Sequence, residues 1–229
     1  FCRYAALENL ESSIAAIVTE EARLVTNWKG KTIVNLSRAF LDTNGVRNEI
    51  EVEVEDVKAD FPQPKFEGNT TKEKLINLLK SDNVASQQGM VEMFDSHVGA
   101  STVLMPYGGK YQLTEEEASV QKVPVLGKES NTASIMTFGY NPFISEWSPF
   151  HGAAYAVVES ISKVVAVGGK WQGIRFSFQE YFERLGNNTE TWGKPFSALL
   201  GTLFVQKGFG LPAIGGKDSM SGTFNNIHV

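Results

Sequence analysis

The chain has 229 residues, of which 42% are hydrophobic and 21% charged, and such a composition is typical of a globular protein with a sizeable core. Its 21 Lys and Arg and 26 Asp and Glu give a formal net charge of −5, which argues against nucleic acid as a partner. The single cysteine, Cys2, excludes an intrachain disulfide framework and a thiolate metal cluster. No apolar run approaches the roughly 20 residues that cross a bilayer, so we expect no membrane partner either.

The first sixty residues contain short segments rich in β-branched residues, which favour strands. The elements expected here are a helical stretch over 4–17, strands over 14–19, 23–28 and 32–34, a helical turn over 36–41 and a strand over 49–57. In the last of these, acidic residues alternate with Ile and Val, which is typical of a strand with one wet face. The chain starts at Phe1 without an initiator methionine. We therefore expect a piece of a longer polypeptide that opens on the closing part of a domain.

A proline-containing segment follows at 61–65, and it predicts a linker because proline lacks the N–H that a sheet needs. We place the boundary between about Asp60 and Gly68. Thr70 and Glu73 form a capping box for a helix to Lys80. The predicted organisation is residues 1–60 as the end of one unit, 61–83 as linker and capped helix, and 84–229 as a second unit.

The second unit mixes helices and strands. The elements expected are short segments over 90–94 and 101–105 around a loop, a buried strand over 132–137, a helix over 148–165, a strand over 174–178, a helix over 196–207 and a strand over 211–214. Ser148 followed by Pro149 predicts the first helix, as N-cap and first helical residue. Gly208 and Gly210 predict the end of the second helix.

A glycine-rich segment after the last predicted strand is the best local signal for a site. Its residues are Gly215, Gly216, Lys217, Asp218 and Ser219. Two glycines let a backbone turn sharply and approach a ligand closely, and the following N–H groups, ammonium and hydroxyl could hold phosphate or carboxylate oxygens. It is not a Walker A loop, whose glycine spacing and Gly-Lys-Ser/Thr tripeptide are missing. The alternative interpretation is a plain turn with solvated Lys217 and Asp218.

A second candidate is Glu159, an acidic residue in an Ala/Val-rich helical stretch. Lys163 lies four residues on, so an ordinary helix ion pair worth about 0.2–0.5 kcal/mol explains it equally well. The aromatic stripe 176–182 could line a pocket with Gln179 and Glu180, although such stripes more often belong to a core. The acidic run 115–117 predicts a solvated face. The three histidines show no metal-ligand spacing.

Five strings occur in one order: FDSHVG at 94–99, SPFHGA at 148–153, VVESI at 157–161, VAVGG at 165–169 and LPAIGGKDSMS at 211–221. In order and spacing they resemble phosphoribosylformylglycinamidine synthase of de novo purine synthesis, over about residues 84–224. Upstream, residues 23–45, with SRAFLDTNG at 37–45, are similar to the closing part of the first synthase-type unit of that enzyme. The resemblance therefore implies a fragment that spans the junction between the two homologous halves.

The resemblance implies an α/β (α+β) fold, an aminoimidazole-ribonucleotide-synthetase-like unit with a mixed sheet flanked by helices, preceded by the closing part of another such unit. It implies a cytoplasmic ATP-dependent ligase that uses ATP and Mg²⁺. Such an enzyme phosphorylates the amide oxygen of formylglycinamide ribonucleotide, and ammonia from a glutaminase domain of the same polypeptide displaces the phosphate. We expect the fragment to be inactive alone and assign none of its residues a catalytic role.

The resemblance also assigns residues. It implies nucleotide or substrate binding for Gly215, Gly216, Lys217, Asp218 and Ser219, and for Gln179, where short members of the family have Asp. Glu159 matches a metal-binding position of long members. Two departures argue against that metal site: Lys163 stands where the family has Asn, and Phe138 where it has an acidic residue. One interpretation is that Lys163 substitutes for the charge of the metal.

Two alternatives remain. In the first, the unit binds a nucleotide that only braces the fold, which the retained Glu159 favours and Lys163 and Phe138 disfavour. In the second, the chain belongs to a relative such as a selenophosphate or thiamine-phosphate kinase, which fits the strings at 148–169 and 211–221 less well. Because units of this kind bury one sheet against a partner, we also expect an exposed apolar face.

Overall fold

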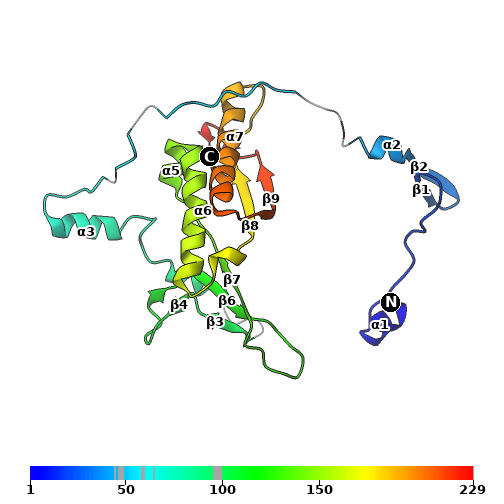
Figure 1. The fold of residues 1–229 in the computed structure, drawn as a ribbon, viewed down its shortest axis with the longest axis horizontal. Coiled ribbons are helices and arrows are strands. Elements are labelled where there is room, and N and C mark those ends of the chain that lie inside the picture. Colours follow the sequence, from blue (N-terminus) through cyan, green and yellow to red (C-terminus); the bar gives the residue numbers. More distant parts are fainter. Residues whose placement is uncertain (44, 46–48, 58–59, 64, 95–99, 229) are drawn as a thin grey trace. The chain divides into compact units, whose positions relative to one another are not determined.

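The computed structural model describes residues 1–43, 45, 49–57, 60–63, 65–94 and 100–228. The chain divides into two compact units, Phe1–Ile50 and Glu51–Val229. This division falls before the predicted boundary at 60–68, and the assignment of 1–60, 61–83 and 84–229 to parts of two synthase-like halves stays a prediction. Figure 1 labels the elements along the chain.

The first unit consists of α1 (Cys2–Leu7), the antiparallel hairpin of β1 (Arg23–Trp28) and β2 (Lys31–Ser37), and α2 (Arg38–Leu41). Lys29 and Gly30 both have positive φ, which is the geometry of a tight two-residue hairpin turn. The Ser37 hydroxyl caps α2 by accepting the Phe40 N–H at 3.2 Å. The strands predicted over 23–28 and 32–34 and the helical turn predicted over 36–41 are thereby confirmed.

Two expectations for the first unit are wrong. The helix predicted over 4–17 ends at Leu7, and the segment 14–19 forms no strand. Its β-branched side chains are exposed, Val18 completely, and no strand in the described part of the chain pairs with it. A β-branched run without a partner ladder gains neither hydrogen bonds nor burial, so its local preference does not produce a strand.

The second unit contains five α-helices among its described residues: α3 (Thr71–Leu79), α4 (Gln88–Val91), α5 (Pro142–Trp147), α6 (Pro149–Ala166) and α7 (Thr189–Phe209). A 3₁₀ turn, η2, covers Trp171–Gly173. The predicted capping box of α3 is confirmed, as is the cap of α6, where the Ser148 hydroxyl accepts the His151 N–H. Helix α7 starts earlier than predicted, at an Asn188 cap, and ends at Gly210 with φ of 68°.

The strands form several small sheets. Strands β3 (Thr102–Leu104), β6 (Ala118–Lys122) and β7 (Ala133–Thr137) make an antiparallel sheet, and β4 (Tyr107–Gly108) pairs with β5 (Thr114–Glu115). Strands β8 (Phe176–Tyr181) and β9 (Ala213–Ser219) pair in parallel through the crossover α7, and β10 (Thr223–Phe224) pairs with β11 (Ile227–His228). The fold is mixed α/β, but its described strands are divided among separate sheets. Strand β7, predicted to be buried, is mostly exposed.

The segment Glu49–Val57, predicted as a strand, has no strand structure. Its Glu53 N–H donates to the Thr189 carbonyl oxygen at 3.1 Å, so this segment contacts the first turn of α7. A single hydrogen bond to a helix does not make the ladder that a strand requires, and no described strand pairs with this segment.

The core lies where α6 and α7 pack against each other and against β8. Its buried members are Val157, Ile161, Phe176, Val205 and Leu211. Figure 1 shows the two long helices side by side. The helix pair and the β8–α7–β9 crossover therefore surround the core of the unit.

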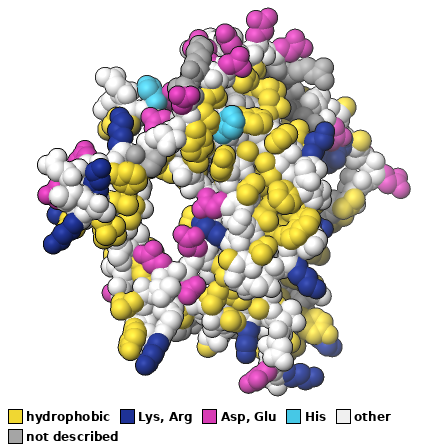
Figure 2. All heavy atoms as spheres, turned by 60° about the vertical axis from the view of Figure 1, so that its left-hand side comes forward, with side chains coloured by type: hydrophobic (Ala, Val, Ile, Leu, Met, Phe, Trp, Pro, Cys, Tyr) yellow, Lys and Arg dark blue, Asp and Glu magenta, His cyan; other side chains and the backbone are white. Residues whose placement is uncertain are grey.

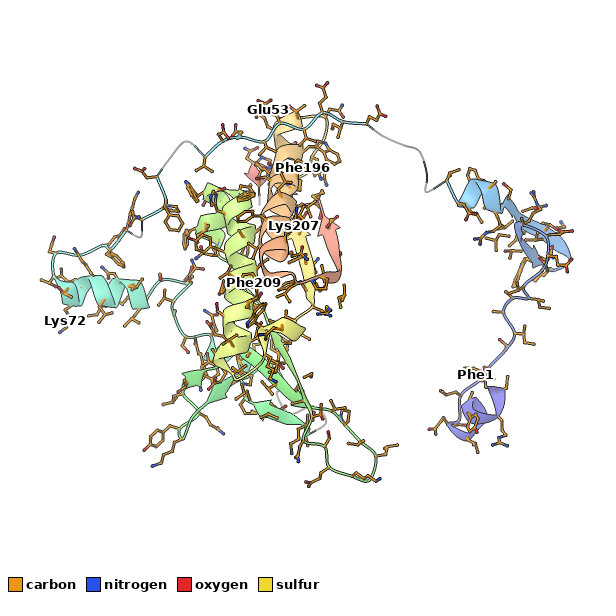
Figure 3. All side chains as sticks on the ribbon, in the orientation of Figure 1. Phe1, Glu53, Lys72, Phe196, Lys207 and Phe209 are labelled. Atoms are coloured by element: carbon orange, nitrogen blue, oxygen red, sulfur yellow. The ribbon has the colours of Figure 1, made fainter. Side chains whose placement is uncertain are left out.

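Much apolar surface stays exposed, as the sequence predicts. On α7 the exposed side chains include Phe196, Leu203 and Phe204, and Figure 3 labels Phe196, Lys207 and Phe209 along this helix. Many hydrophobic side chains also lie on the face drawn in Figure 2. None of the described helices has the length and apolar character needed to span a membrane.

Candidate functional site

The glycine-rich segment is part of a strand. Residues 215–219 form most of β9, which corrects the expectation of a turn after a strand. Neither glycine has a positive φ, and a Cβ at Gly216 would lie 2.6 Å from the Phe178 carbonyl oxygen of β8. Gly216 therefore permits two strands to approach each other. At Gly215, by contrast, the described residues leave open space around an added Cβ, so this position is accessible to a ligand.

The parallel register brings the predicted binding residues together. Lys217 lies opposite Gln179, and the Gln179 side-chain amide donates to the Lys217 carbonyl oxygen at 3.3 Å. Ser219 follows at the end of β9, 3.1 Å from the Ser221 hydroxyl. Within the described residues this sheet has two strands, so the outer edge of β9 presents backbone N–H groups. An exposed ammonium beside free N–H groups suits phosphate or carboxylate oxygens.

Two carboxylates also meet on these strands. Glu180 of β8 lies opposite Asp218 of β9, and Glu180 is 9% exposed. Burial and, second, the negative charge of Asp218 raise the pKa of Glu180 to about 7. A carboxyl group that can hold a proton near neutral pH therefore lies on the buried face of β8, whereas Lys217 pairs with the exposed Gln179. Sequence reasoning connected Glu180 only with a possible pocket, because its pairing with Asp218 depends on the strand register.

Glu159 lies elsewhere, where α6 packs against the end of β7. One of its oxygens, Oε1, accepts from the Lys163 ammonium at 2.8 Å, and Oε2 accepts the Tyr140 N–H at 3.1 Å. The same ammonium lies 3.2 Å from Glu117 Oε2 and 4.4 Å from the centre of the Phe138 ring. Glu117 is exposed, as the predicted solvated face requires, and it also reaches a side chain that is distant in sequence.

The residues around Glu159 do not fit a magnesium ion. Magnesium needs about six oxygen ligands in near-octahedral geometry, whereas both Glu159 oxygens are already engaged by donors. In the described part of the chain, no group of three or more His, Cys, Asp and Glu is placed to hold a metal. Burial lowers the pKa of Lys163, but hydrogen bonds and charge from Glu159 and Glu117 outweigh it and raise the pKa overall. The lysine is a cation at neutral pH, and the metal role of Glu159 stays a prediction.

A cavity of about 700 Å³ lies against the three-stranded sheet. Its walls include Glu117 and the exposed side chains of Met136 and Phe138, so this cavity is a depression open to solvent. Near Glu117 the cavity therefore adjoins Lys163. Sequence reasoning missed this cavity, because its walls come from strands separated along the chain.

The string at 94–99 lies mostly outside the described residues, so His97 has no structural assignment.

The buried Glu183 is a residue that no motif in the sequence marks. Its carboxylate accepts a hydrogen bond from the Lys194 ammonium and lies 3.4 Å from His228 Nδ1. Glu183 therefore connects α7 with the C-terminal hairpin, and no local pattern signals this arrangement.

No family model matches the chain. It is 25% identical over 227 residues to the phosphoribosylformylglycinamidine synthase subunit PurL of Thermoplasma volcanium, covering 96% of this chain and 28% of that protein. It is 28% identical over 215 residues to PurL of Pyrobaculum calidifontis, covering 91% and 28%. PurL of Leuconostoc mesenteroides is 26% identical over 219 residues, covering 93% and 27%. The chain thus spans less than a third of the length of these relatives.

Solved structures from Thermotoga maritima show the same fold. The structure of PurLQS matches with a TM-score of 0.63 at 15% identity, covering 92% of this chain and 30% of that chain. PurL complexed with ATP matches with a TM-score of 0.60 at 14% identity and the same coverage. The chain is therefore a distant homologue of part of PurL, and it shares the fold of the corresponding part.

Proposed function

We propose that this chain is a nucleotide- and substrate-binding part of a PurL-type ligase, which converts formylglycinamide ribonucleotide, ATP and glutamine-derived ammonia into formylglycinamidine ribonucleotide. The observation that carries the proposal is similarity to PurL along 96% of the chain, and the shared fold supports it. The relatives and structures named above are all PurL proteins, which favours this ligase over the kinases of the same superfamily.

The exposed face of β8 and β9 is the part of the unit that we assign to ligand binding. Lys217 supplies a positive charge for phosphate oxygens, and the outer edge of β9 supplies backbone N–H donors. Gly215 leaves room for the ligand beside the strand. Gln179 contributes by holding the Lys217 carbonyl, which fixes the lysine backbone against β8. Ser219 adds a hydroxyl at the end of the strand.

We expect no turnover from the 229-residue chain alone. It spans less than a third of PurL. The family resemblance also implies that the glutaminase, which supplies ammonia, lies outside this chain. Phosphoryl transfer depends on charge stabilisation from all sides of the transferred group. One face with one lysine does not supply it, so the chain provides part of an active site.

The alternative of a nucleotide that only braces the fold depended on Glu159. In the structure this carboxylate holds the Lys163 ammonium and the Tyr140 N–H. The bracing alternative thereby loses the residue that favoured it, and we assign the binding role to β8 and β9.

Thermal unfolding with and without ATP, ADP and formylglycinamide ribonucleotide tests the proposal. A ligand at 100 times its Kd adds about 2.7 kcal/mol to the free energy of unfolding. We expect such a shift with wild type and at least about tenfold weaker binding with Lys217→Ala. Gly215→Ala should also weaken binding while leaving the ligand-free melting temperature nearly unchanged, because its Cβ meets open space.

Lys128→Ala is the matched control, because it removes the same charge from an exposed position of the same unit. Gly216→Val is a poor probe, since its side chain would separate β8 from β9 whether or not a ligand binds there. The absence of any shift in wild type would contradict the proposal. A shift that Lys217→Ala leaves unchanged would move the site away from β9.

A further inference from the structure

The junction of α6 and β7 contains a cation of its own. We call Lys163, Glu159, Glu117 and Phe138 the Lys163 cluster. Its ammonium is bound by one carboxylate at 2.8 Å and another at 3.2 Å, and it is covered by an aromatic ring at 4.4 Å. The Lys163 side chain is only 12% exposed. Bound cations in proteins are held in the same manner, by converging oxygens and limited access to water.

The protein backbone holds this arrangement in place. A Cβ at Gly139 would overlap the Ala156 carbonyl oxygen, so the chain after β7 lies directly on α6. The Thr137 hydroxyl donates to the Ser160 carbonyl oxygen at 2.7 Å, which fixes the same contact. Tyr140 then reaches Glu159 with its N–H. The carboxylate is therefore held at once from the segment after β7, through Oε2, and from α6, through Oε1 and the ammonium.

A cation neutralises the charges at this position. Two carboxylates lie within 3.2 Å of one nitrogen, and they would repel each other without it. The Glu117 side chain is 65% exposed and that of Glu159 38%, so water weakens this repulsion, and the buried partner is the ammonium. A divalent cation and an ammonium satisfy the same requirement, but they exclude each other from the same space. The aromatic face of Phe138 adds a cation–π contact that suits the ammonium.

We propose that the Lys163 ammonium takes the place of a divalent cation between Glu117 and Glu159, so that this position binds no Mg²⁺ or Mn²⁺ in the natural chain. The proposal rests on the proposed function in one respect: it compares the position of Lys163 with the metal site that the resemblance to the ligase predicts at Glu159. Its consequence is that ligand binding on β8 and β9 needs no metal held by Glu159. Removing the ammonium opens the carboxylate pair to a divalent cation.

Mn²⁺ titration of the 229-residue chain, followed by electron paramagnetic resonance without nucleotide, tests the proposal. We expect wild type to show no site at this position, and Lys163→Ala to gain one Mn²⁺ site at least about tenfold tighter than any in wild type. Mg²⁺ should raise the melting temperature of Lys163→Ala and not that of wild type. The double variant Lys163→Ala with Glu159→Gln is the matched control and should lose the gained site.

Two results would overturn the proposal. The first is a Mn²⁺ site in wild type that Glu159→Gln removes. This measurement does not depend on whether a Lys163 variant folds. The other is a folded Lys163→Ala chain that gains no Mn²⁺ site. Because the titration contains no nucleotide, its outcome is independent of whether ATP or formylglycinamide ribonucleotide shifts the melting temperature.

Discussion

The helix pair α6–α7 and the hairpin β1–β2 both follow from clear local signals, yet only the helix pair buries its apolar side chains. Val157, Ile161 and Val205 of the pair are each 8% exposed or less. All six residues of β1 are exposed, among them Leu24 at 48%. A local pattern therefore specifies a helix or a strand, whereas burial of its side chains requires a second surface to pack against. The chain supplies such a surface for the two helices.

The helix contact can be broken at Gly201. A Cβ at this position of α7 would overlap the Phe150 carbonyl oxygen of α6. Because backbone meets backbone there, neither helix can yield without moving as a whole, and Gly201→Ala should destabilise the second unit by about 3 kcal/mol. Urea unfolding followed by circular dichroism measures the loss.

Gly208→Ala provides the control in the same helix. An added Cβ at this position has open space among the described residues, and alanine favours a helix over glycine. This variant should be as stable as wild type or up to about 1 kcal/mol more stable. Equal stability of Gly201→Ala and Gly208→Ala would show that the two helices do not pack closely.

The contrast between the two units can be measured with a pair of leucines. Leu211 is 4% exposed within the helix-pair core, so Leu211→Ala should destabilise the second unit by about 3 kcal/mol. Leu24→Ala in β1 should change stability by less than about 0.5 kcal/mol, because half of its side chain is already exposed. Thermal unfolding of both variants checks this. A large effect of Leu24→Ala in the isolated chain would mean that β1 has a buried face.

The features that the sequence predicted depend on neighbouring residues. Thr70 and Glu73 cap α3, Ser148 caps α6 and Gly210 ends α7, because each acts within one turn of its helix. The mixture of helices and strands also follows from local patterns, whereas the α/β fold and the exposed apolar face are expectations from the family resemblance.

The rest depends on register and on distant partners. Gly216 was assigned to a ligand-binding turn, but its absent side chain accommodates the Phe178 carbonyl of a strand 38 residues upstream. Glu117 lies on the solvated face that the sequence predicts, but its contact with Lys163 at the α6–β7 junction is not predicted. No local pattern encodes either contact, since both arise only after the intervening elements have packed.

A smaller effect than those of Gly201 and Leu211 concerns charge on the buried side of the parallel strands. The pKa of Glu180 is raised to about 7 by burial and by Asp218, so between pH 4.5 and 7 the folded state binds more protons than the unfolded state. The free energy of unfolding therefore falls as the pH rises through this window. Glu180→Gln removes the charge and should stabilise the chain by on the order of 1 kcal/mol at pH 8, with no gain at pH 4.

Asp42→Asn extends this test to the first unit. Asp42 forms an exposed ion pair with Arg38 at 3.3 Å, and such pairs contribute at most a few tenths of a kcal/mol. Its loss should give a slight destabilisation at pH 8, opposite in sign to the gain from Glu180→Gln. Melting temperatures of both variants from pH 4 to pH 8 compare the two positions. If Glu180→Gln gave the same change at both pH values, packing of the amide rather than removal of a buried charge would explain it.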